Sequence, residues 1–296
     1  MKDPSNALHK NGTGVLYLVA TPIGNLQDIT LRALKTLEEV DFIAAEDTRQ
    51  TAKLLNHFGI KKPLISYYEY NKAERGSYLI AQLCEGKKAA LVSDAGTPGI
   101  SDPGEDLVRL AIKNNIAVTM IPGPSAAIMG LVLSGMQTGR FVFEGFLPMN
   151  KRSRRERLLS LKNESRTVIL YEAPHKLVHT LKDLFEVLGD RRIAIARELT
   201  KRYEEISRCS LSEAIEMYAA KTPKGEFVLI LEGASEDGFL DEQREKWADM
   251  SLEEHFRYYL DRGCNRKEAV KKISIDRGLS KREVYNSLLK DDKKGV

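Results

Sequence analysis

The sequence predicts an α/β protein of two domains, followed by a small, all-helical C-terminal module. Three observations predict this fold class. The chain has 296 residues, enough for about two domains of ordinary size. Short apolar runs alternate with segments of helical spacing, which is typical of a parallel-rich sheet covered by helices. Residues 251–290 show helical spacing alone, so they are expected to contain no sheet.

The composition is that of a globular protein, with 42% hydrophobic and 30% charged residues. Cys84, Cys209 and Cys264 lie far apart and match neither a zinc site nor a disulfide framework, which indicates a reducing compartment and hence a cytoplasmic protein. The polar residues 1–13 lack the apolar segment of a signal peptide and are expected to form a disordered tail. No run of about 18 apolar residues is present, so we expect no association with a membrane.

The N-terminal domain is expected to span residues 14–124. Strands are predicted where short apolar runs end in turn-rich loops, at 15–20, 42–45, 88–93 and 117–121. Apolar residues at helical spacing predict helices between them, around Leu31 to Val40, over 51–58, and around Leu107 to Ala111. This alternation favours a parallel sheet.

The second domain is expected to span residues 125–235. Its strands are predicted at 141–144, 167–172, 193–198, 204–209 and 227–232, and its helices at 151–162, 174–187 and 211–219. No helix separates the third strand from the fourth, which predicts an antiparallel pair and therefore a mixed sheet. An acidic, glycine-containing linker is expected at 235–243.

Residues 244–296 are expected to form a basic helical module of three helices. Asn265 and Ser280 are predicted to cap the second and third helices, which have the proportions of a helix-turn-helix. Residues 262–296 carry eleven Lys/Arg and five Asp/Glu, a surplus that predicts a polyanionic partner. The basic residues expected on its outer faces include Lys271, Lys272, Lys281 and Arg282.

Three loops rich in glycine or proline follow predicted strands, at 21–25, 94–104 and 122–125. In open α/β sheets ligands bind at the carboxyl ends of the strands, so these loops predict a small-molecule site. The chain has neither G-x-G-x-x-G nor G-x-x-x-x-G-K-[ST], which argues against common dinucleotide and nucleoside triphosphate sites. His175 and His179 lie four apart but lack a third ligand, and we expect no metal.

Seven motifs occur in order along residues 14–235 and carry a resemblance to a known family. They are 19–26 (VATPIGNL), 45–49 (AEDTR), 93–104 (SDAGTPGISDPG), 121–126 (IPGPSA), 171–175 (YEAPH), 196–201 (ARELTK) and 223–226 (PKGE). Together they resemble the tetrapyrrole-methylase superfamily of S-adenosylmethionine-dependent methyltransferases. Within that superfamily the chain is most similar to the branch that methylates ribose in bacterial ribosomal RNA.

The resemblance implies two α/β domains that bind S-adenosylmethionine in the cleft between them, and a homodimer. It also implies the reaction, methylation of the ribose 2′-hydroxyl of a decoding-centre cytidine in 16S rRNA, with the small ribosomal subunit as partner. Matched motif by motif, the implied cofactor-binding residues are Asp94, Gly96, Thr97, Ser125, Ala126, Tyr171, Gly225 and Glu226.

A ribose hydroxyl is a poor nucleophile, so a general base or nearby cations should assist the transfer. Asp47 follows a strand and is the first candidate for the base, with Arg49 as a phosphate contact; alternatively, the two form a local pair that caps the next helix. Glu172 is the second candidate. Further contacts to the RNA backbone are expected from basic side chains, namely Arg32, Lys151, Arg152, Arg154 and Arg155.

Two other functions remain open at this point. A tetrapyrrole methyltransferase would keep the cofactor and change the acceptor, but residues 21–25 read Thr-Pro-Ile-Gly-Asn where porphyrin-modifying relatives have a glycine-rich loop. A DNA-binding regulator would use the module as a helix-turn-helix and the α/β domains as a ligand sensor. The basic segments favour the RNA enzyme over the tetrapyrrole enzyme.

Overall fold

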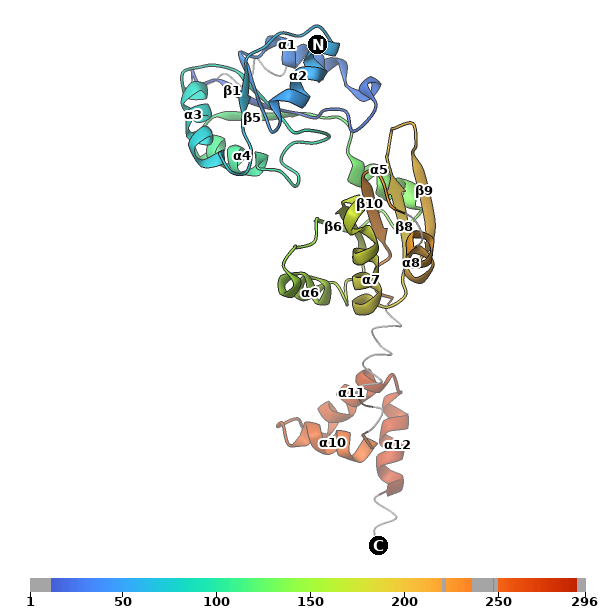
Figure 1. The fold of residues 1–296 in the computed structure, drawn as a ribbon. Helices are drawn as coiled ribbons and strands as arrows, with labels where there is room; N and C mark the ends of the chain where they lie inside the picture. Colours follow the sequence, from blue (N-terminus) through green and yellow to red (C-terminus); the bar gives the residue numbers. More distant parts are fainter. Residues whose placement is uncertain (1–11, 220–221, 236–246, 248–249, 292–296) are drawn as a thin grey trace.

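The computed structural model describes residues 12–219, 222–235, 247 and 250–291. Figure 1 shows two α/β domains and a C-terminal helical module, and the predicted fold class is confirmed. Most of the expected tail 1–13 and of the expected linker 235–243 lies outside the described residues. The predicted limits of the domains and of the module therefore stay predictions.

The first domain contains a parallel sheet with the strand order β3-β2-β4-β1-β5. Its strands are β1 (Val15–Val19), β2 (Phe42–Ala45), β3 (Leu64–Ser66), β4 (Ala89–Val92) and β5 (Ala117–Ile121). The central strands β1, β2 and β4 are buried along their whole length. Such continuous apolar runs are expected for parallel strands that helices cover on both faces.

Helices cover this sheet in two pairs. Helices α1 (Leu31–Glu39) and α2 (Thr48–His57) pack on one face, and α3 (Lys72–Cys84) and α4 (Gly104–Lys113) pack on the other. Alternate residues of each strand thus enter two separate apolar clusters. Strand β3 and helix α3 were not among the elements predicted from the sequence.

The second domain contains a mixed sheet with the strand order β6-β7-β10-β8-β9. Its strands are β6 (Phe141–Gly145), β7 (Thr167–Glu172), β8 (Arg192–Arg197), β9 (Glu205–Ser210) and β10 (Phe227–Leu231). Strands β6 and β7 pair in parallel, whereas β7 with β10, β10 with β8 and β8 with β9 pair antiparallel. The mixed sheet and the antiparallel β8–β9 pair agree with the prediction from the sequence.

Helices α6 (Lys151–Ser160), α7 (Leu177–Leu188) and α8 (Leu211–Ala219) pack on one face of the second sheet, and α5 (Ala126–Ser134) packs on the other. Ile23, from the loop after β1 of the first domain, is buried in the same apolar cluster as Ala127 and Leu131 of α5. The loop after β1 is therefore anchored in the core of the second domain, which fixes it at the junction of the two domains.

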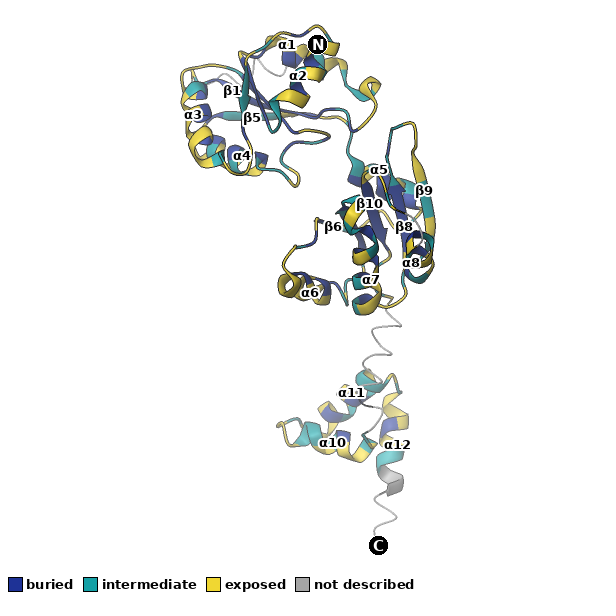
Figure 2. Ribbon diagram, viewed as in Figure 1, coloured by how far each residue is buried: buried dark blue, intermediate teal, exposed yellow. Residues whose placement is uncertain are grey.

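The helical module comprises α10 (Leu252–Leu260), α11 (Arg266–Arg277) and α12 (Lys281–Asp291). Capping boxes begin α10 at Ser251 and α11 at the predicted Asn265. Figure 2 shows that little of the module is buried; its fully buried side chains include Ala269, Ile273 and Val284. Its interior is small, so much of each helix faces solvent.

Candidate active site

A cleft of about 410 Å³ lies between the two α/β domains. The first domain contributes the ends of β2 and β4 and the loop after β4; the second contributes the start of α5, the end of β7 and the start of β10. A volume of this size suits a nucleoside-sized ligand. Residues of all three loops rich in glycine or proline line this cleft, and its use as a small-molecule site stays a prediction.

Seven of the eight residues implied to bind the cofactor line this cleft: Asp94, Gly96, Thr97, Ser125, Ala126, Tyr171 and Glu226. The eighth, Gly225, adjoins it and has a φ of +97°. A Cβ at Gly225 would lie 2.6 Å from Cγ of Glu198, so both its backbone conformation and its neighbour require glycine there. The structure brings the set together, and their binding role stays a prediction.

The loop after β4 is held in place by its own polar contacts. Gly96 and Thr21 exchange two backbone hydrogen bonds, of 2.9 and 3.0 Å, which tie this loop to the one after β1. The Asp102 carboxylate accepts hydrogen bonds from the backbone N–H groups of Gly99, at 2.9 Å, and Gly104, at 2.7 Å. These bonds fix the backbone before a ligand arrives.

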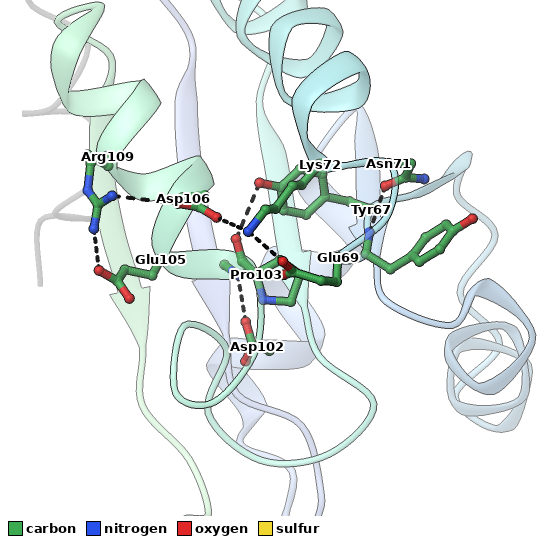
Figure 3. A network of polar contacts seen from close by, with 11 residues as sticks. Tyr67, Glu69, Asn71, Lys72, Asp102, Pro103, Glu105, Asp106 and Arg109 are labelled. Atoms are coloured by element: carbon green, nitrogen blue, oxygen red, sulfur yellow. Dashed lines mark hydrogen bonds and ion pairs between the residues drawn. The ribbon is translucent and has the colours of Figure 1, made fainter. Parts of the chain in front are cut away.

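A second layer of contacts supports the far end of that loop (Figure 3). The Tyr67 hydroxyl donates to the carbonyl oxygen of Pro103 at 3.3 Å. The Lys72 ammonium lies 2.7 Å from Glu69 and 2.8 Å from Asp106, the latter in the first turn of α4. The loop is therefore fastened to the start of α3 as well as to the loop after β1.

Asp47 and Arg49 form a local pair that caps α2, which was the alternative to a catalytic role in the sequence analysis. The Asp47 carboxylate caps α2 by accepting from the backbone N–H of Arg49 at 2.8 Å, and it also pairs with the guanidinium at 2.8 Å. Hydrogen bonds from Arg49 lower the pKa of Asp47 to about 2. The Arg49 side chain is 86% exposed and remains accessible to a phosphate.

Glu172 lines the cleft, but its side chain is already engaged. The residue is only 5% exposed, and its carboxylate accepts hydrogen bonds from the Thr180 hydroxyl and, at 2.8 Å, from the backbone N–H of Ala173. These contacts hold the carboxylate against α7. Its geometry favours a structural role over that of a general base.

Glu46 is a functional candidate that the sequence analysis missed. It directly follows β2, lines the cleft and is half-buried, and its carboxylate lies near the backbone N–H of Asp94. Burial, together with the negative charges of Asp94 and Asp102, raises the pKa of Glu46. The available signal was its place directly after a predicted strand, one residue before Asp47.

Lys201 contacts both domains beside the cleft, and it was not identified as a functional candidate from the sequence. Its ammonium lies 2.9 Å from Glu198 and 2.8 Å from Glu226. A Cβ at Gly24, in the loop after β1, would lie 2.3 Å from Cγ of Lys201. Lys201 thus holds Glu226 at the cleft while its stem packs closely on the first domain.

The basic run that begins α6 divides into exposed and buried residues. Lys151, Arg152 and Arg155 are exposed, as is Arg32 on α1. Arg154 is only 8% exposed, and its guanidinium contacts Asp183 at 2.5 Å and Thr180 at 2.8 Å. The expectation that Arg154 contacts RNA was wrong, because the helix turns this side chain into the domain.

The basic residues of the module also divide. Lys271 and Lys281 line an open groove, and Arg282 is exposed. The Lys272 ammonium instead lies 3.1 Å from Sγ of Cys264 and 5.1 Å from the centre of the Tyr259 ring. Lys272 is thus directed along the surface of its own module.

Within the described part of the chain, no group of three or more His, Cys, Asp or Glu side chains is placed to hold a metal ion. The same residues include no helix that is both long and apolar enough to cross a membrane.

Comparison with known proteins identifies the family. The sequence profile of the Tetrapyrrole (Corrin/Porphyrin) Methylases matches residues 15–215. Three similar proteins are named Ribosomal RNA small subunit methyltransferase I. The one from Halalkalibacterium halodurans is 50% identical over 97% of this chain and 98% of its own length. The one from Bacillus subtilis is 46% identical over 94% and 95%. The one from Thermotoga maritima is 51% identical over 74% of this chain and 99% of its own length.

Solved structures share the fold at low sequence identity. Diphthine synthase has a TM-score of 0.56 and 15% identity, over 74% of this chain and 90% of its own. Uroporphyrin-III C-methyltransferase from Thermus thermophilus, complexed with S-adenosylhomocysteine, has a TM-score of 0.52 and 16% identity, over 73% and 97%. The profile covers more than half of the chain, and the relatives from Halalkalibacterium halodurans and Bacillus subtilis match it nearly end to end. The chain therefore belongs to the Tetrapyrrole (Corrin/Porphyrin) Methylase family.

Proposed function

We propose that the protein is an S-adenosylmethionine-dependent methyltransferase that modifies the 16S rRNA of the small ribosomal subunit. The observation that carries this proposal is the match, over 97% of the chain, to a protein named Ribosomal RNA small subunit methyltransferase I. The acceptor is the ribose 2′-hydroxyl of a decoding-centre cytidine, and the protein acts in the cytoplasm, where ribosomes are found.

The cleft fits the cofactor chemically. S-adenosylmethionine combines a planar, aromatic adenine with a sulfonium, an ammonium and a carboxylate group, and its net charge is positive. The aromatic rings of Phe146 and Tyr171, with centres 5.7 Å apart, offer an apolar wall. The carboxylates of Asp94 and Glu226 are placed to meet hydroxyl or ammonium groups, and their negative charge suits a cationic ligand.

When bound, the cofactor supplies an electrophilic methyl group, and the protein's own residues orient the acceptor and remove its proton. Of the candidate carboxylates, Glu46 suits the role of proton acceptor best because it lines the cleft and its pKa is raised. Asp47 lies at the same strand end but is far less basic. The exposed Arg49 would hold a neighbouring phosphate of the RNA.

The RNA backbone is proposed to lie across the basic surfaces on both sides of the cleft. Arg32 belongs to the first domain, and Lys151, Arg152 and Arg155 belong to the second. Arg152 also pairs with Glu156 at 3.0 Å, an exposed contact that competes weakly with phosphate. The helical module is proposed to add affinity for RNA and to take no part in cofactor binding.

The proposed homodimer is supported by helix α5, whose sequence AAIMGLVLS is apolar on all sides. One side packs on the second sheet, yet Ile128 is 47% exposed and Val132 is 64% exposed. A helix that is apolar all round is normally buried on every side. A second copy of the chain would cover this outer face.

The experiment that tests the proposal is transfer of tritiated methyl groups from S-adenosylmethionine, followed by mapping of the modified nucleotide. Small ribosomal subunits are expected to become labelled at one ribose, while large subunits and uroporphyrinogen III do not. Labelling of the tetrapyrrole and not of the subunit would replace the proposal with the tetrapyrrole enzyme. Specific binding to operator DNA without any methyl transfer would favour the regulator.

A further inference from the structure

An open groove of about 660 Å³ crosses the helical module. Its apolar lining comes from Phe256 of α10, Val270 of α11, and Tyr285 and Leu288 of α12. Tyr285 is 58% exposed and Phe256 is half-buried. Two aromatic rings from different helices therefore border the same groove, outside the small buried interior of the module.

Basic residues surround this apolar lining: Arg266, Lys267, Lys271 and Lys281. Among the residues that line the groove in the described part of the module, a single acid, Glu268, accompanies them. Its carboxylate accepts a hydrogen bond from the backbone N–H of Asn265 at 3.1 Å, as part of the capping box of α11. Since that carboxylate is engaged at the helix terminus, positive charge dominates the groove.

Aromatic rings bordered by cations are complementary to an unpaired nucleotide. A base can stack on an exposed ring while its flanking phosphates meet the ammonium groups. Duplex RNA fits less well, because its bases already stack on one another and its major groove is too deep and narrow for side chains to read. An acidic peptide would satisfy the charges but not the rings.

We infer that this groove binds single-stranded RNA, with an unstacked base on Tyr285 and the neighbouring phosphates on Lys271 and Lys281. The inference rests on the proposed function, because it takes the bound strand to be part of the enzyme's own rRNA substrate. It assigns the module a contact to single strands, whereas a helix-turn-helix role would place α12 in the groove of a duplex.

The test uses the full-length protein and a fluorescent oligouridylate, either alone or annealed to oligoadenylate. The single strand is expected to bind more tightly than the duplex. Tyr285→Ala should weaken single-strand binding about tenfold, the loss typical of one stacked base, whereas Tyr285→Phe should keep it. Lys271→Ala should weaken binding and lower the slope of log affinity against log salt by about 0.7.

Arg257→Ala is the matched control for Lys271→Ala, because it also removes one exposed positive charge from the module but does not line the groove. It should leave binding and slope nearly unchanged, and thermal melting should show every variant folded. Equal binding of oligouridylate by folded Tyr285→Ala and the unsubstituted protein would overturn the inference. So would displacement of oligouridylate by oligoglutamate of equal charge, which would indicate a site for acidic peptides.

Methyl transfer separates this inference from the proposed function. At saturating small ribosomal subunits, Tyr285→Ala should methylate at the maximal rate of the unsubstituted protein and differ only in the subunit concentration required. Failure of the unsubstituted protein to methylate any rRNA would sink the proposed function. If the unsubstituted protein methylates rRNA normally but Tyr285→Ala binds oligouridylate as tightly as it does, only the inference about the groove is refuted.

Discussion

Replacing Glu46 by glutamine removes a proton acceptor from the cleft and leaves the shape of the side chain almost unchanged. If Glu46 takes the proton of the ribose hydroxyl, Glu46→Gln should lower the maximal rate of methyl transfer by roughly a hundredfold to ten-thousandfold. S-adenosylmethionine affinity should change little, because glutamine keeps the size of the side chain and one of its acceptor oxygens. Titration calorimetry and a methyl-transfer assay on small ribosomal subunits measure the two quantities.

Asp47→Asn is the matched comparison, because it changes the same chemical group one residue along the chain. The pKa of Asp47 is about 2, some 2.5 below the usual glutamate value of 4.5, and that of Glu46 lies above 4.5. Asp47 is thus the weaker base of the two. Asparagine also caps helices as well as aspartate does, so Asp47→Asn should fold normally and retain much of its rate.

The pH dependence provides a second readout. Burial and the charges of Asp94 and Asp102 raise the pKa of Glu46, so the folded protein holds this proton more tightly than the unfolded chain does. The rate should rise with pH through this raised pKa, and Glu46→Gln should remove that limb. The ionised carboxylate also costs stability at neutral pH, a cost that disappears as the pH falls below 4.5.

Glu46→Gln should therefore melt at a higher temperature than the unsubstituted protein at neutral pH, and the difference should shrink in acid. Slower turnover with higher stability is the signature of a charge kept for function. A Glu46→Gln protein that methylates at the normal rate would refute the assignment. If Asp47→Asn were then the slow variant, the base would be Asp47, as the sequence first suggested.

Three further changes test other parts of the molecule. Asp94→Ala should weaken S-adenosylmethionine binding at least tenfold by calorimetry, because it removes a cleft carboxylate that also accepts from the backbone N–H of Asp47 at 2.9 Å. Val132→Glu should dissociate the proposed dimer, observed by sedimentation velocity, because it places a charge on the outer apolar face of α5. Shortening the chain to residues 1–243 should leave cofactor affinity intact and weaken rRNA binding. It should also lower the slope of log affinity against log salt concentration by about 0.7–0.9 for each phosphate that the module neutralises.

Much of the fold could be predicted because strands such as β1, β4 and β10 are continuous apolar runs that are followed by turn-rich loops. Strand β3 was missed because it has three residues, all only partly buried, too few for a period to show. Helix α5 was missed because it is apolar on every side and so lacks the amphipathic pattern that marks a surface helix.

The sequence indicated which loops line the cleft, but it did not indicate how the individual side chains are oriented there. Most of the implied cofactor residues lie at one cleft. Asp94, Gly96 and Thr97 do so because they follow the carboxyl end of the parallel strand β4, whereas Glu226 precedes the antiparallel strand β10. A sequence cannot show which of two adjacent carboxylates points inward, so Glu46 was passed over for Asp47. Nor can it show that Arg154 turns into the domain while Arg155 stays outside.

The distribution of charge shows how a single protein could serve a cationic cofactor and a polyanionic substrate. Carboxylates gather in the cleft, at Glu46, Asp94 and Glu226, where they repel phosphate, and Asp94 and Glu226 are the two proposed to face the cofactor. Exposed cations lie outside it, on α1, α6 and the helical module. On the proposed function, we expect the RNA strand to be held by its backbone outside the cleft, so that only the nucleotide to be modified reaches inward. Salt should weaken the binding of the RNA backbone far more than the binding of the nucleotide in the cleft. The reason is that exposed charges are screened more strongly than half-buried ones.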